Sequence, residues 1–212
     1  DPELYVTGLY WLDVEDEEYA LAWAARFGRS LRPVPVETVR QNIPALATSF
    51  QRALFAPGVA NIRNPRLVRA LRTALEHMEG VEIRSQQPVQ GFVTESGRIV
   101  GVRTATGECR ADQIVLAAGA WSGELLGTLG LQLPVEPVRG QMALFKRTPD
   151  FLPSMVLARR RYAIPRRDGH ILVGSTLEYC GFDKSVTQEG LESLRSSAAE
   201  LLPELAQAPV VG

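Results

Sequence analysis

The spacing of apolar residues in the first quarter of the chain predicts short strands and helices. Leu4 to Val14 is rich in Tyr, Val, Leu and Trp, which is typical of a strand. Glu15 to Phe27 has an amphipathic pattern with an acidic first turn, and we expect a helix that Gly28 ends. A short helix near Val36 to Asn42 and a strand near Ala53 to Ala56 are also expected.

Helical spacing is clearest after residue 63. Asn64 and Pro65 have the residue types that favour a helix start, and Gly80 is placed to end the helix. The apolar residues of this segment recur on one helical face: Leu67, Val68, Leu71, Ala74, Leu75 and Met78. We therefore predict an amphipathic helix, followed by a short strand over Val81 to Arg84.

A β-meander is predicted next. Val89 to Glu95 and Arg98 to Thr104 flank Ser96-Gly97, which suits a two-residue hairpin turn. This turn would place Glu95 opposite Arg98 and Val93 opposite Val100.

Two further segments complete a pattern that is typical of nucleotide-binding α/β units. Asp112 to Ala118 ends in a wholly apolar run, which predicts a parallel strand buried on both faces. Trp121 to Leu129 is expected to form a short helix after it.

From Pro134 onward the chain becomes rich in β-type residues. Strands are expected within Val135 to Arg147, Met155 to Arg166 and His170 to Thr176, and Gln188 to Leu202 predicts a final helix that Pro203 stops. The fold class is therefore predicted to be mixed α+β. We place domain changes near residues 58 and 131, giving segments 1–58, 59–130 and 131–212.

Composition narrows the possible functions. The 23 Lys and Arg residues balance 24 Asp and Glu residues, which argues against a nucleic-acid surface. The longest apolar runs, Tyr19 to Ala25 and Ile114 to Trp121, are too short to cross a membrane. Cys109 and Cys180 are too few and too far apart for a disulfide scaffold, so we expect free thiols in the cytoplasm.

Common catalytic motifs are missing. His77 and His170 are the only histidines and form no metal-ligand pattern, so we interpret both as structural and expect no metal site. The segment Gly119 to Gly123 has the spacing G-x-x-S-G, which differs from the nucleophile elbow of hydrolases. No G-x-G-x-x-G fingerprint for dinucleotides is present.

Three glycines recur every fourth residue, at Gly119, Gly123 and Gly127. One interpretation is close packing of a helix on a sheet. The alternative is a close approach of the backbone to a cofactor beyond the carboxyl end of a strand, where ligands of open α/β sheets bind.

The dipeptide Asp168-Gly169 suggests a hairpin whose register can be calculated. A two-residue turn would pair Tyr162 with Ser175 and Arg160 with Leu177, and would place these four on one face together with the Ile164 and Val173 pair. A cation, a phenol and an apolar wall suit a small ligand that bears a carboxylate. The alternative is a solvated arginine beside a half-buried tyrosine.

Four segments in order resemble the D-amino-acid oxidase family of FAD-dependent oxidoreductases, and within it the bacterial glycine oxidases of the thiamine pathway. They are Ile114-Val-Leu-Ala-Ala-Gly-Ala-Trp-Ser-Gly123, Pro137-Val-Arg-Gly-Gln141, Tyr162-Ala-Ile-Pro-Arg-Arg-Asp-Gly169 and Val173-Gly-Ser-Thr176. Gly181-Phe-Asp-Lys184 fits the same group. The resemblance extends over nearly the whole chain.

The resemblance implies an antiparallel-sheet substrate domain, formed by 1–58 and 131–212, and a Rossmann-like FAD-domain portion over 59–130. It implies that Tyr162 meets the substrate carboxylate and that Arg160 and Leu177 line the active-site wall. It further implies cofactor contacts, which fall on Val89, Ala117, Ala118, Gly119 and Trp121. Arg160 stands where glycine oxidases can have histidine, which affects substrate preference.

The resemblance also implies a reaction: oxidation of glycine or a small amino acid to its imine, with dioxygen reduced to hydrogen peroxide. This chemistry depends on orientation, so no side chain is assigned a catalytic acid or base role. The implied partners are a small amino-acid or amine substrate and dioxygen, without nucleic acid or membrane, in a possible homo-oligomer. A D-amino-acid dehydrogenase or a sarcosine-oxidase-like enzyme is the alternative within the family.

Two family elements are expected to lie outside the chain. The glycine fingerprint with its acidic ribose ligand would precede Asp1, and the carboxylate-binding arginine would follow Gly212. We therefore expect the 212-residue chain by itself to hold FAD weakly or not at all, and to be inactive or to act only as a non-catalytic domain. Stoichiometric flavin absorbance of the purified chain would contradict this.

Overall fold

The computed structural model describes all 212 residues, and the chain folds into two compact units. The large unit comprises residues 1–71, 140–178 and 184–212, and the small unit comprises residues 72–139 and 179–183. Helices and mainly antiparallel strands occur in both, so the predicted mixed α+β class is confirmed. The assignment of the predicted segments to a substrate domain and an FAD domain stays a prediction.

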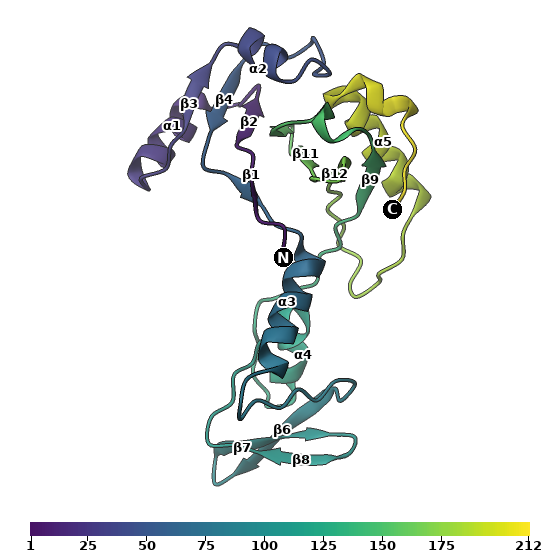
Figure 1. The fold of residues 1–212 in the computed structure, drawn as a ribbon. Coiled ribbons are helices and arrows are strands. Elements are labelled where there is room, and N and C mark those ends of the chain that lie inside the picture. Colours follow the sequence, from purple (N-terminus) through teal and green to yellow (C-terminus); the bar gives the residue numbers. More distant parts are fainter. The chain divides into compact units, whose positions relative to one another are not determined.

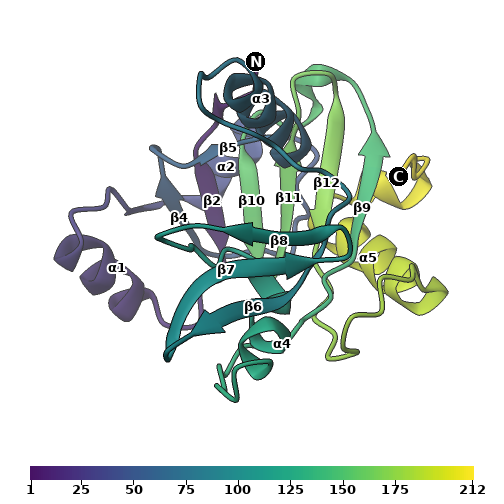
Figure 2. The same ribbon diagram turned by 90° about the horizontal axis from the view of Figure 1, so that it is seen from below.

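A seven-stranded sheet forms the centre of the large unit, and Figure 2 shows its strands side by side. The only parallel neighbours in the sheet are β2 and β10. In sheet order the strands are β3 (Arg32–Val34), β4 (Ala53–Ala56), β2 (Leu9–Leu12), β10 (Met155–Ala158), β11 (Arg161–Pro165), β12 (His170–Gly174) and β9 (Met142–Lys146). The short strands β1 (Tyr5–Val6) and β5 (Ala60–Asn61) pair separately.

Helix α5 (Gln188–Leu201) packs against β9, β11 and β12, as Figure 1 shows. Helix α2 (Val36–Asn42) adds Val39 to the same buried core. Alternation along the strands selects the residues that face this core, including Phe145, Val156 and Val173, all of which are fully buried.

Helix α1 (Glu17–Arg26) forms within the predicted Glu15 to Phe27 segment. The Asp16 carboxylate accepts a hydrogen bond from the Tyr19 backbone N–H at 2.8 Å, which caps the first turn. Gly28 follows with φ +61°, a conformation that glycine adopts at little cost. The predictions of α1, α2, β4 and α5 are confirmed.

Two predicted strands of the large unit are each divided. The Leu4 to Val14 strand is interrupted at Gly8, where φ is +68°, and Met155 to Arg166 is divided by a turn at Arg159 and Arg160. Both arginines have positive φ, 46° and 66°, so this tight turn forms without glycine or asparagine. No turn residue marks it in the sequence.

The small unit contains the predicted meander, with β6 (Val89–Glu95), β7 (Arg98–Thr104) and an additional strand β8 (Gly107–Arg110). Glu95 pairs with Arg98 as predicted. The register then shifts between Val93 and Thr94, so Val93 faces Gly101 and not Val100. An irregularity of this kind inserts a residue that strand alternation cannot reveal. Helix α4 (Ser122–Gly127) follows where a helix is predicted.

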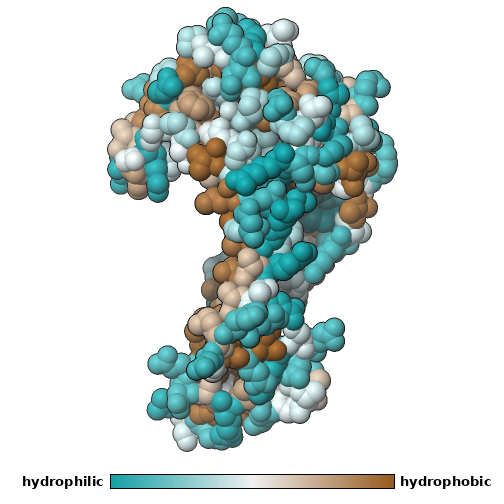
Figure 3. Space-filling view, viewed as in Figure 1, coloured by the Kyte–Doolittle hydropathy of each residue, from teal (hydrophilic) through white to brown (hydrophobic).

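Helix α3 (Asn64–Glu76) forms as predicted, but its apolar face stays open. None of its residues is buried, and Val68 and Leu71 are 64% and 55% exposed. Figure 3 shows hydrophobic residues reaching the surface in the region of this helix. Periodicity thus predicted the helix correctly, whereas no segment of the chain covers the face that the periodicity defines.

Two predicted strands are absent from the structure. Val81 to Arg84 and Asp112 to Ala118 contain no strand residues, and Val115 is 88% exposed. The buried parallel strand predicted from the apolar run is therefore wrong for this chain. A strand exists through hydrogen bonds to neighbouring strands, and no segment of the chain pairs with either stretch.

Gly190 allows a buried amide to pack against the first turn of α5. Gln141 Nε2 donates to Thr187 Oγ1 at 2.8 Å and to Glu178 Oε1 at 2.7 Å, while Gln141 Oε1 accepts from the Thr187 N–H at 2.9 Å. A Cβ at residue 190 would lie 2.7 Å from Gln141 Cδ. The amide would have to move away and give up these bonds.

We expect Gly190→Ala to lower the free energy of unfolding of the full-length protein by about 1–2 kcal/mol. Loss of the buried hydrogen bonds costs about 1–3 kcal/mol, which exceeds the roughly 1 kcal/mol that alanine contributes as a helix former. Urea unfolding gives the difference. Gly127→Ala is the matched control, because Gly127 is also helical and has open space around its Cβ position, and it should be neutral or stabilising. Equal behaviour of the two variants would contradict the packing argument.

Candidate functional site

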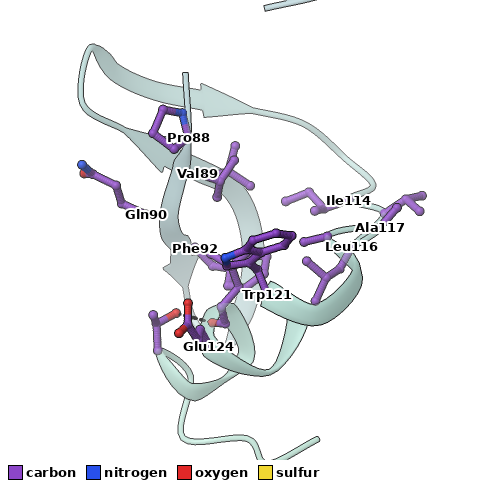
Figure 4. Close-up of a pocket in the computed structure, with 14 residues that line it drawn as sticks. Pro88, Val89, Gln90, Phe92, Ile114, Leu116, Ala117, Trp121 and Glu124 are labelled. Atoms are coloured by element: carbon purple, nitrogen blue, oxygen red, sulfur yellow. Dashed lines mark hydrogen bonds between the residues drawn. The ribbon is translucent and has the colours of Figure 1, made fainter. Parts of the chain in front are cut away.

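A cavity of about 840 Å³ in the small unit contains most of the predicted cofactor residues. Val89 at the start of β6, Ala117 and Ala118 in the extended segment, and Trp121 before α4 all line it. Figure 4 shows the Trp121 indole between strand β6 and the 114–117 segment. The structure therefore brings Val89 together with three residues that are far from it in the sequence of the small unit.

The lining of this cavity is almost wholly apolar. Phe92 is buried at its base, the Trp121 ring stacks on Phe182 at 5.3 Å, and Glu124 is the only ionisable residue among the lining side chains. Apolar walls with a few polar groups are typical of small-molecule and cofactor sites. A diphosphate needs cations or a set of backbone N–H donors, and a carboxylate disfavours it. The residues present thus fit a ring portion of FAD but not its diphosphate.

Gly119 lies beside this cavity but does not line it. Its φ is +55°, and nothing approaches its Cβ position within 4 Å. The sequence suggested that this glycine follows the carboxyl end of a strand and lets the backbone come close to a cofactor. The strand is absent, so that part of the prediction is wrong, whereas the approach to a cofactor stays a prediction. Among the protein's own atoms, the left-handed backbone conformation is what favours glycine here.

The glycine repeat has different surroundings at each position. A Cβ at Gly123 would lie 3.5 Å from the Val135 carbonyl oxygen, which is an ordinary contact between α4 and a loop. Gly127, like Gly119, has open space. None of the three glycines has a strand within contact distance of its Cβ position, so packing of these glycines on a sheet is not found.

The hairpin between β11 and β12 has a register that differs by one residue from the predicted one. Tyr162 pairs with Gly174, and Ile164 pairs with Leu172. The Arg166 N–H donates to the His170 carbonyl, so the loop holds three residues, with Gly169 in the left-handed conformation at φ +80°.

This shift overturns the predicted set of six residues on one face. Val173 pairs with Ala163, and both face the core, so Val173 does not share the face of Ile164. Gly174, not Ser175, lies opposite Tyr162. The predicted register therefore gives no support to a group of Tyr162, Ser175 and Arg160.

Arg160 and Leu177 are not the cross-strand partners that the predicted register made them. Arg160 belongs to the turn between β10 and β11, and it lines a cavity of about 490 Å³ together with Trp11, Asp13 and Leu157. Leu177 follows β12 and is 67% exposed. The two residues do not pair, because β11 begins only at Arg161 and β12 ends at Gly174.

Asp168 fixes the hairpin loop through charge. Its carboxylate lies 2.8 Å from His170 Nδ1 and 3.2 Å from Arg63 Nη1. Burial alone would raise the pKa of Asp168, but the hydrogen bonds from His170 and Arg63 outweigh it and lower the pKa to about 2. His170 thus has a structural partner, and the Nδ1 atom of His77 lies 2.7 Å from the Thr73 carbonyl oxygen.

Two residues that the sequence did not single out hold Tyr162 in place. Arg161 donates to the Ser175 carbonyl, to Ser197 Oγ at 3.2 Å and to Ser193 Oγ at 3.3 Å, which ties β11 to α5. Gly174 lies under the Tyr162 ring. The many arginines gave no signal for Arg161, and Gly174 could be identified only with the correct register.

Neither a metal site nor a membrane helix is found. No group of three or more His, Cys, Asp or Glu side chains is placed to hold a metal ion. No helix has both the length and the apolar character that a membrane crossing requires.

Comparison with known proteins defines the class. The family of FAD dependent oxidoreductases known as DAO matches residues 1–211. The chain therefore belongs to this family, which confirms the resemblance noted in the sequence.

Among the relatives that the chain resembles are two glycine oxidases. The chain is 60% identical over 211 residues to the glycine oxidase of Pseudomonas putida and 58% identical over 206 residues to that of Pseudomonas aeruginosa, covering 100% and 97% of this chain. It spans only 58% and 57% of the length of these relatives. It is also 37% identical over 177 residues to the bifunctional protein ThiO/ThiG of Nostoc, covering 81% of this chain and 26% of that protein.

Solved structures agree with the fold. The glycine oxidase of Geobacillus kaustophilus superposes on the whole chain with a TM-score of 0.90 at 27% identity, and 58% of its own length is covered. The glycine oxidase of Bacillus cereus gives a TM-score of 0.88 at 24% identity and is covered over 60% of its length. The latter similarity concerns the fold alone.

Proposed function

We propose that the full-length protein containing this chain oxidises glycine or a similarly small amino acid to its imine and releases hydrogen peroxide. The observation that carries this proposal is the 60% identity to a glycine oxidase over the entire chain, combined with membership of the FAD-dependent family. The 37% identity to ThiO/ThiG supports a role in thiamine biosynthesis. Cys109 and Cys180 are not joined in a disulfide, which is compatible with the cytoplasmic location that we infer.

The reaction balances as a two-electron oxidation. The substrate loses a hydride from its α-carbon and a proton from its nitrogen, and dioxygen takes up the equivalent of both to become hydrogen peroxide. FAD, when bound, supplies the site that accepts the hydride. Water then hydrolyses the imine to a carbonyl compound and ammonia.

The residues of this chain would bind and orient the reactants. We propose that the Tyr162 hydroxyl donates a hydrogen bond to the substrate carboxylate and that Arg160 and Leu177 contribute to the wall of the substrate site. We further propose that Val89, Ala117, Ala118, Gly119 and Trp121 hold the cofactor, with the apolar cavity taking a ring portion. The diphosphate ligands would come from segments outside residues 1–212.

Activity of the purified full-length protein tests the function. Peroxide formation that depends on glycine and consumes one dioxygen per peroxide is the expected result. Turnover of glycine only with an artificial electron acceptor, and no peroxide, would identify a dehydrogenase. No turnover of glycine, sarcosine or D-alanine would contradict the proposal.

Gly119→Leu in the full-length protein is expected to lower FAD retention more than it lowers stability. A leucine forced to φ +55° costs about 1–2 kcal/mol locally, and relief of this strain would move Ala117, Ala118 and Trp121. The ratio of flavin to protein absorbance measures retention. Gly97→Leu is the control, because Gly97 has φ +77°, open space and a place in the distant hairpin turn. Equal FAD content in the two variants and the parent would contradict a cofactor role for this segment.

A further inference from the structure

The Tyr162 ring lies directly over the backbone of Gly174. A Cβ at residue 174 would lie 2.5 Å from the Tyr162 Oη, 2.6 Å from Cζ and 2.8 Å from Cε2. Real side chains do not approach so closely, so any residue larger than glycine would displace this edge of the ring. The edge that would move includes the hydroxyl itself.

Other contacts prevent β11 from moving to relieve such a clash. Leu157 of β10 pairs with Tyr162 on the side opposite Gly174. The neighbouring Arg161 is bonded to the Ser175 carbonyl and to two serines of α5. The strand is therefore fixed from both edges and from its other face, and the phenol is the part that would yield.

We infer that Gly174 is a positioning residue that sets the location of the Tyr162 hydroxyl and thereby determines recognition of the substrate carboxylate. This inference rests on the proposed function, in which that hydroxyl binds the carboxylate. Gly174 has no side chain with which to bind the substrate. Its contribution is the space left by the missing side chain.

The test uses the full-length protein and acetate, a carboxylate that lacks an amine. Inhibition of glycine oxidation by acetate, measured at several glycine concentrations, gives an inhibition constant for the parent and for G174A, Y162F and Y162F/G174A. G58A is the matched control, because the Cβ position of Gly58 has open space and the residue lies in the same unit.

We expect G174A to raise the acetate inhibition constant about tenfold, similar to Y162F, because both remove one hydrogen bond to a charged group. The double variant should be little weaker than Y162F, since a displaced ring without its hydroxyl has nothing more to lose. G58A should match the parent.

The results distinguish a failure of the Gly174 inference from a failure of the proposed role of Tyr162. If Y162F weakens acetate binding and G174A does not, the positioning role of Gly174 is wrong and the proposed role of Tyr162 stands. If neither variant changes acetate binding, the proposed carboxylate site is wrong and the inference falls with it. If G174A has the same effect with and without the Tyr162 hydroxyl, Gly174 acts independently and the inference is also overturned.

If G174A does not fold well, a stability measurement tests whether Tyr162 is what constrains residue 174. The melting temperature of Y162A/G174A should equal that of Y162A, because the ring that clashes is gone. A large loss of melting temperature in Y162A/G174A relative to Y162A would show that residue 174 is constrained by something other than Tyr162, and would overturn the inference.

Discussion

Gly169→Ala is expected to destabilise the full-length protein by about 3–5 kcal/mol, because two independent costs add at this position. The φ of +80° costs an alanine about 1–2 kcal/mol. In addition, the new Cβ would overlap the Arg147 carbonyl oxygen and lie 3.1 Å from the Pro149 nitrogen. These are backbone atoms, and the Arg147 N–H is itself bonded to the Gly169 carbonyl at 2.9 Å.

Urea unfolding of the parent, Gly169→Ala and Gly97→Ala separates the two costs. Gly97 has nearly the same φ, +77°, but open space at its Cβ position, so its variant should lose only about 1–2 kcal/mol. A difference between the variants reports the clash with the 147–149 backbone. Equal losses would mean that the loop moves away from that backbone without cost, contrary to the structure.

Tyr162→Phe in the full-length protein should reduce kcat/KM for glycine by about ten- to a hundredfold. Loss of a hydrogen bond from a phenol to a carboxylate costs about 1.5–3 kcal/mol of transition-state stabilisation. Phenylalanine keeps the ring over Gly174, so the change removes the hydroxyl and little of the packing.

A comparison of two substrates assigns the loss to the carboxylate. Ethylamine carries the reacting amine but no carboxylate, and its kcat/KM should be nearly unchanged in Tyr162→Phe. Arg166→Lys is the control, because Arg166 follows the opposite end of β11 from Tyr162, and both substrates should react with it as with the parent. Similar losses for glycine and ethylamine in Tyr162→Phe would defeat the assignment of Tyr162.

Most local elements and the family could be predicted from residues that are close together in the chain. Capping and periodicity predicted α1, α2, α3 and α5, since these signals depend on residues within one or two turns of each other. The ordered segments around Ile114, Pro137, Tyr162 and Val173 were sufficient to identify the FAD-dependent family. These conclusions did not require knowledge of which elements touch.

The pairing of the elements and the surroundings of each residue depend on contacts between segments that are distant in the sequence, and the structure was needed to find them. The register of β11 and β12 differs by one residue from the predicted one, so Gly174 and not Ser175 lies opposite Tyr162. The Asp168-Gly169 dipeptide is compatible with a loop of two residues and with a loop of three, so the sequence could not fix this register. The turn at Arg159 and Arg160 had no sequence signal, because arginine does not favour positive φ.

The apolar run ending at Ala118 is another segment whose structure could not be predicted from its own residues. Its composition fits a buried strand, yet a strand needs neighbours, and none of residues 1–212 pairs with it. The sequence indicates which side chains are suited to burial. Whether other segments are present to bury them is a property of the assembled fold.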